Sequence, residues 1–295
     1  MAVSDHRRRR SGDRAELLGA ALMALLLPSP ALAHGGEGEG WLSEPWVLVP
    51  LLLSGGLYAA GLLRLWGSVG VGRGIRPVQA LCFAAGWLTL AVALVSPLHV
   101  AGLTSFSAHM TEHELLMAVA APLLVVARPV GAFLWAFPKG ARPGLADGFR
   151  TRPLRAAWRV LCDPVVATVL HGATLWVWHL PAAFDAALAS EALHTLQHAS
   201  FLITALFFWW AMREHGGGLA VLCLFATSVH GTVLGALLTV APRALYDYTG
   251  PLADQQMAGL IMWVPAGMVY AGAGLALCGR LIRRSGRRMK QFETP

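Results

Sequence analysis

Residues 219–240 read LAVLCLFATSVHGTVLGALLTV, a run without Asp, Glu, Lys or Arg. A helix of about 20 apolar residues crosses the hydrocarbon core of a bilayer, which is about 30 Å thick. This stretch therefore predicts a transmembrane helix. Over the whole chain of 295 residues, 56% are hydrophobic and only 13% are charged, against about 25% charged in an average soluble domain. The composition excludes an ordinary soluble globule.

Six further apolar stretches of similar length are separated by Pro, Gly or charged residues. We predict an all-α integral membrane protein whose transmembrane domain, residues 34–282, is a bundle of seven transmembrane helices. Residues 283–295 are predicted to form a basic cytoplasmic tail. The seven predicted spans are 46–63, 78–95, 109–126, 164–180, 193–212, 219–240 and 255–277.

Residues 1–33 have the pattern of a secretory signal peptide. Five Arg residues precede the apolar run 17–27, which is followed by Pro28, Pro30 and the small-residue triplet 31–33. The pattern predicts cleavage before His34. An uncleaved membrane anchor is the alternative.

The positions of the 23 Lys and Arg residues predict the orientation. With the mature N-terminus outside, seventeen of them lie in the inner connections and the tail, five lie in the signal peptide, and only Arg243 lies outside. Membrane proteins concentrate Lys and Arg on the cytoplasmic side. We therefore predict a multi-pass protein of the bacterial plasma (inner) membrane with its C-terminus in the cytoplasm. The formal charge of +7 reflects this topology and contact with the lipid bilayer, and gives no support for nucleic-acid binding.

The outer side is predicted to be acidic and to lack cysteine. Nine Asp and Glu residues fall in the outer connections or the outer ends of spans, so this side should attract cations. The four cysteines fall near the inner ends of their helices, without Cys-x-x-Cys spacing. We interpret them as packing residues. An outer metal site would have to use His, Met and carboxylate ligands.

Two matched histidine segments open the third and fifth predicted spans. The first is His109-Met110-Thr111-Glu112-His113 and the second is His194-Thr195-Leu196-Gln197-His198. Each presents imidazoles at positions i and i+4 and a carboxylate or amide at i+3, which share one face of a helix. If the two helix ends face each other, they gather four imidazoles at the membrane boundary, where unused polar side chains are costly.

The four imidazoles of His109, His113, His194 and His198 therefore predict a metal site, with copper favoured by a nearby thioether. The first segment also matches the inverted zinc-protease pattern His-x-x-Glu-His. Because the second segment has an amide in place of the acid, we interpret both as ligand pairs and expect no enzyme. Residues expected to add ligands or orient the rings are Met110, Glu112, Gln197, His179, Asp254, His34 and His99. His171 and His230, nearer the middle of their spans, are candidates for an internal relay.

These segments, with Trp178-His179-Leu180-Pro181 and Asp254-Gln255-Gln256, resemble those of the polytopic CtaG-type cytochrome c oxidase assembly factors. The resemblance covers about residues 46–282. It implies a membrane protein that matures haem-copper oxidase by handling copper, with oxidase subunits or another copper chaperone as partners. One departure is Glu112, since the family pattern has an amide there.

Two other classes of function stay open from the residues alone. A b-type haem protein would use one imidazole from each of two facing helices and would carry electrons or haem. A copper or proton transporter would use His171 and His230 as stations near the midplane.

Overall fold

The computed structural model describes residues 45–248 and 250–292. The predicted signal peptide and His34 lie outside these residues. The described residues form helices joined by turns, without a strand. The all-helical prediction is thereby confirmed. The described residues divide into two units, residues 45–87 with 126–158 and residues 88–125 with 159–248 and 250–292.

The first unit is built around helix α2, Pro45–Val69, and the beginning of α3, Pro77–Leu94. Gly70, Gly72 and Gly74 all adopt positive φ in the turn between these helices, a conformation that costs glycine little. The ring of Tyr58 on α2 stacks on Phe83 of α3 with centroids 3.6 Å apart.

Three short helices complete the first unit: α7, Pro129–Trp135, α8, Arg142–Phe149, and the greater part of α9, Arg152–Leu161. Helix α7 packs closely on α2, because a Cβ added to Gly61 would lie 1.8 Å from the carbonyl oxygen of Ala132. The long basic connection between the third and fourth predicted spans is thus helical in this part.

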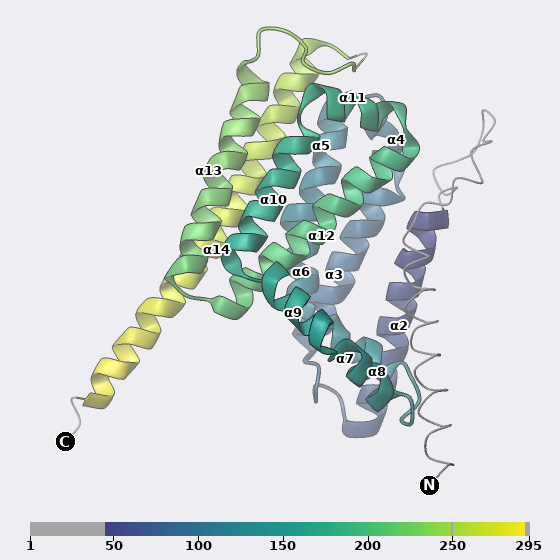
Figure 1. The fold of residues 1–295 in the computed structure, drawn as a ribbon, viewed down its shortest axis with the longest axis vertical. Helices are drawn as coiled ribbons and strands as arrows, with labels where there is room; N and C mark the ends of the chain where they lie inside the picture. The colour runs from purple at the N-terminus through teal and green to yellow at the C-terminus, as the bar shows by residue number, and fades with distance from the viewer. Residues whose placement is uncertain (1–44, 249, 293–295) are drawn as a thin grey trace. The chain divides into compact units, whose positions relative to one another are not determined.

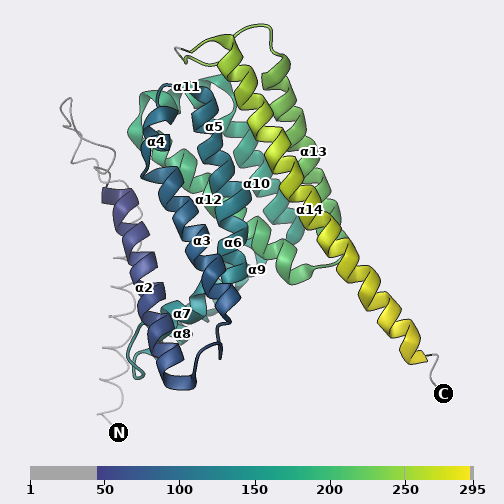
Figure 2. The same cartoon turned by 180° about the vertical axis from the view of Figure 1, so that it is seen from behind.

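The second unit contains the two histidine segments. Its longer helices, α10, α12, α13 and α14, run side by side with α5 (Figures 1 and 2). Their bounds, with those of the shorter elements of this unit, are α4 Pro97–Gly102, α5 Phe106–Glu114, the π-helix η2 Leu115–Ala120, α6 Ala121–Ala127, α10 Pro164–Trp178, α11 Pro181–Ala189, α12 Glu191–His215, α13 Gly218–Val240 and α14 Leu252–Phe292.

Helices α13 and α14 approach each other through glycines. A Cβ on Gly259 would lie 2.5 Å from the carbonyl oxygen of Gly235 and 2.4 Å from the hydroxyl of Thr239. Small residues allow such close backbone contact in membrane helices, where packing drives association. This contact fixes the position of α14 against α13, and α14 also packs against α5.

Among the residues that the structure describes, five helices or helix runs are long and apolar enough to cross a membrane: Pro45–Val69, Pro77–Leu94, Phe106–Ala127, Gly218–Val240 and Leu252–Arg283. The bent pair of α9 and α10, with 70° between its halves, makes a sixth if it is counted as one span. The protein is therefore a multi-pass membrane protein. The fifth predicted span, 193–212, is the one that remains; helix α12, which contains it, has His194, Gln197 and His198 near one end and Arg213 near the other, so its composition does not mark it as a span. The count of seven stays a prediction.

Candidate metal centre

Three helices of the second unit bring the histidines together. Helix α5 carries His109, Glu112 and His113 on one face, and α12 carries His194, Gln197 and His198. The short helix α4 adds His99. Its start is fixed by Ser96, whose hydroxyl accepts a hydrogen bond from the amide of Leu98 at 3.1 Å.

Four of these side chains converge on one point. One ligand atom from each of His109, Glu112, His194 and His198 lies within 4.8 Å of the others, and all four residues are buried. The sequence predicts His113 as the fourth ligand, whereas in the structure Glu112 takes that place. The rest of the predicted set lies together as expected, because the two segments do face each other. We call these four residues the outer cluster.

The carboxylate of Glu112 lies between two imidazoles. Its Oε1 is 3.3 Å from Nδ1 of His99, and its Oε2 is 3.6 Å from Nε2 of His198. The ring of His99 also stacks near that of His194, with centroids 5.6 Å apart. His99 therefore borders the outer cluster through Glu112, and α4 completes that side of the site.

Several polar atoms at the outer cluster have no hydrogen-bond partner within the described residues. They include both ring nitrogens of His113, which lies next to His109, and the Nε2 of His179. An unsatisfied buried polar atom costs about 1–3 kcal/mol, and such atoms are rare in folded proteins. Their concentration at one place fits a site whose lone pairs bind a cation, since imidazole and carboxylate are good ligands for late transition metals.

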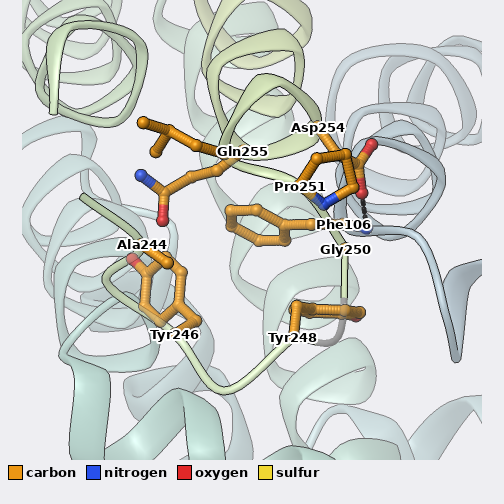
Figure 3. A pocket seen from close by; sticks show the side chains of 9 residues that line it. Phe106, Ala244, Tyr246, Tyr248, Gly250, Pro251, Asp254 and Gln255 are labelled. Atoms are coloured by element: carbon orange, nitrogen blue, oxygen red, sulfur yellow. Dashed lines mark hydrogen bonds between the residues drawn. The ribbon is translucent and has the colours of Figure 1, made fainter. Parts of the chain in front are cut away.

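An aromatic layer covers His109 on one side. The ring of Phe184 is 5.3 Å from that of His109, and Phe106 packs against Phe184, Tyr246 and Tyr248. Figure 3 shows Phe106 and the two tyrosines lining a pocket beside the start of α14.

The two tyrosine hydroxyls of this layer fasten it to neighbouring turns. Burial raises the pKa of both Tyr246 and Tyr248, so both hydroxyls remain protonated and donate. Tyr246 donates to the carbonyl of His179 at 2.9 Å, and Tyr248 donates to that of Gly102 at 2.8 Å. The layer is thereby held over the site.

Asp254 supports the cluster from α14 without joining it. Its carboxylate accepts hydrogen bonds from the amides of Phe106, at 2.6 Å, and Ser107, at 3.2 Å, and from the hydroxyls of Ser105 and Ser107. It thus satisfies the free amides at the start of α5, which carries His109 and Glu112. The dashed line in Figure 3 marks the carboxylate bonded to the chain at Phe106.

The other predicted residues take different positions. Met110 is fully buried in the hydrophobic core. His171 is buried, with Nδ1 3.1 Å from the hydroxyl of Thr204 and Nε2 3.5 Å from that of Tyr270. His230 lines a separate cavity with Glu114, Met117, Met262 and Tyr270. The four cysteines are free, and Cys162 and Cys223 are buried.

Glu114 is a half-buried residue that lines the cavity of His230, and the sequence alone placed it among the outer acids. It lies where α5 passes into the π-helix η2, a feature often found at functional sites. Glu114 is four residues after Met110 and three before Met117, so it shares a helix face with these two core residues. That spacing could have indicated that Glu114 faces the protein.

Fold and site together define a multi-pass helical membrane protein with a buried His and Glu cluster near the start of α5. Residues 56–284 match the family model for the cytochrome c oxidase caa3 assembly factor (Caa3_CtaG), so the chain belongs to this family. The resemblance inferred from the histidine segments is confirmed. No curated protein and no solved structure matches the chain.

Proposed function

We propose that this assembly factor binds copper at the outer cluster and delivers it to a cytochrome c oxidase subunit. The observation that carries the proposal is the convergence of His109, Glu112, His194 and His198 within 4.8 Å. Membership of an oxidase assembly family supplies the recipient. Copper is the metal that a haem-copper oxidase needs at its centres.

The donor set suits a copper ion that must later be released. Three imidazoles and one carboxylate provide nitrogen and oxygen donors, a set that both copper and zinc accept. The described cluster contains no cysteine ligand, so a tight thiolate bond does not retain the ion. The carboxylate offsets one positive charge where burial makes an unpaired cation expensive.

Transfer needs a path by which a ligand of the recipient can replace one of the cluster. His194 and His99 are the most accessible histidines here, at 9% and 8% exposure, whereas His109 is at 1%. We infer that copper enters and leaves at the side of His194 and His99, where a recipient or a copper chaperone displaces the imidazole of His194 first.

The proposed topology places this exchange outside the membrane. Seven spans, an N-terminus outside after signal-peptide removal, and a basic cytoplasmic C-terminus put the outer cluster at the outer face of the bacterial plasma membrane. The distribution of Lys and Arg supports this orientation. The role is non-catalytic, because the ligands hold an ion and no substrate bond is changed.

Metal analysis of the detergent-purified protein tests the proposal. After exposure to copper and desalting, the wild-type protein should retain copper, and His198→Asn should retain much less. The matched control is His215→Asn, on the same helix but exposed at its other end, which should bind as the wild type does. Cells that carry His198→Asn should also lose caa3 oxidase activity while cells that carry His215→Asn keep it.

Three outcomes would contradict the proposal. One is equal copper retention by His198→Asn and the wild type. The second is a Soret band with sharp α-bands in the absorption spectrum, which indicates haem. The third is retention of zinc with no retention of copper when the two are offered together.

A further inference from the structure

Two buried histidines beside the outer cluster are left outside its set of ligand atoms. His113 and His179 are 1% and 5% exposed. They come from different elements, since His113 is on α5 and His179 is the capping residue that follows α10. Both ring nitrogens of His113 and the Nε2 of His179 have no hydrogen-bond partner in the described part of the chain.

The protonation of His179 is fixed by its backbone contact. Its Nδ1 lies 2.7 Å from the carbonyl oxygen of Leu175, and a carbonyl oxygen can only accept a hydrogen bond. Nδ1 therefore carries the ring proton and donates it. In the neutral ring the lone pair is then on Nε2, the atom without a partner. This is how proteins commonly orient a metal-binding imidazole, with one nitrogen bonded to a carbonyl and the other to the ion.

The separation of the two rings suits an ion held between them. An imidazole nitrogen bonds a late first-row metal at about 2 Å and is about 1 Å from its ring centre, so two collinear imidazoles have centres about 6 Å apart. The centroids of His113 and His179 are 6.4 Å apart. Small rotations of either side chain cover the difference.

The surroundings of the pair restrict which ion it can hold. Phe201 is 4.7 Å from His113 and 6.2 Å from His179, and Phe184 is 6.1 Å from His179, by ring centroids. These apolar rings offer no further ligand, and the nearby imidazoles of His109 and His198 belong to the outer cluster. Zn²⁺ is almost always four-coordinate, and Cu(II) prefers a square or tetragonal set of ligands. Cu(I), a filled-shell ion, is stable with two neutral nitrogen ligands in line.

We propose that His113 and His179 form a second copper position, selective for Cu(I), next to the outer cluster. The two positions adjoin through His113, whose ring centroid is 4.3 Å from that of His109 and 4.9 Å from that of His198. The chain would then carry two copper ions, one exchangeable and one more deeply buried. This inference rests on the proposed function in that the ion is copper.

Anaerobic titration of the full-length protein with Cu(I), against a chromophoric Cu(I) chelator, tests the second position. The wild type should take two equivalents, and His179→Asn should take one. Asparagine can place its Nδ2 where Nδ1 was, so it keeps the bond to Leu175 and loses only the Nε2 lone pair. The double variant His194→Asn with His198→Asn should still take one equivalent, and His215→Asn should take two.

Zinc is the folding control, because only the outer cluster has enough ligands for it. Wild type and His179→Asn should both bind one equivalent of Zn²⁺. Any of three results would overturn the second position. The first is a wild type that takes a single Cu(I). The second is a His179→Asn protein that binds zinc but takes either two Cu(I) or none, and the third is a double variant that takes none. A wild type that takes a single Cu(I) would still be consistent with a copper site at the outer cluster. A wild type that binds no copper overturns the proposed function as well.

Discussion

Replacing Glu112 by Gln probes the electrostatics of the outer cluster most cleanly. The change removes one negative charge and keeps the size and shape of the side chain. Glu112 is fully buried, with its two oxygens 3.3 and 3.6 Å from ring nitrogens of His99 and His198. The fold should therefore persist while the attraction for a cation falls.

The magnitude follows from the geometry. An ion among the four ligand atoms, which lie within 4.8 Å of one another, is no farther than that from the carboxylate. Two unit charges at this distance interact by about 3.5 kcal/mol at an effective dielectric constant of about 20. At about 1.4 kcal/mol per factor of ten, Glu112→Gln should raise the copper dissociation constant about 300-fold.

Competition with a chromophoric chelator of known affinity measures this change. The matched control is Asp247→Asn, which makes the same substitution at an exposed residue of the segment before α14. Water and salt screen the charge of an exposed carboxylate far more than that of a buried one, so the control should bind copper nearly as the wild type does. A Glu112→Gln protein that binds copper within threefold of the wild type would refute the placement of this carboxylate beside the ion.

Three further substitutions test the scaffold. Asp254→Ala removes the acceptor at the start of α5 and should cost about 1–2 kcal/mol of stability; an unchanged thermal unfolding temperature would contradict this cap. Gly259→Ala puts a Cβ 2.4 Å from its nearest neighbour and should cost about 1–3 kcal/mol, while Gly267→Ala, with nothing within 4 Å, should be tolerated; equal unfolding temperatures would contradict the close contact. Gly102→Ala places a Cβ 3.0 Å from the Glu112 carboxylate and should weaken copper binding several-fold in the chelator assay without removing a ligand; unchanged affinity would show that the carboxylate has room to move.

The long helices were predictable because bilayer thickness sets the length of an apolar run. The predicted span 219–240 differs from α13 by one residue at its start, and the predicted span 164–180 begins where α10 begins. The short helices α4, α7, α8, α9 and α11 were not predicted, because they lie in connections without a sustained apolar period. Helix α14 runs on through the predicted basic tail to Phe292, since Arg and Lys favour helix as readily as apolar residues do.

The candidate site was predictable in its segments but not in its detailed partners. Spacing of three and four residues shows that His109, Glu112 and His113 share a helix face. Which of them points at α12 depends on the rotation of α5 about its axis, which Asp254 and the packing against α14 help to set. The position of His99 beside Glu112 depends on the turn from α4 into α5, and no pattern in the sequence predicts that turn.

X-ray absorption spectroscopy of the His179→Asn protein loaded with one equivalent of copper examines the outer cluster alone. The proposed site predicts a coordination sphere of imidazole nitrogens and one carboxylate oxygen, from His109, His194, His198 and Glu112, without a sulfur scatterer. In the Glu112→Gln background the ion should lose its carboxylate while its imidazole signal persists. A spectrum with a strong sulfur contribution, or one that is unchanged when His194 and His198 are both replaced by Asn, would contradict a copper site at this place.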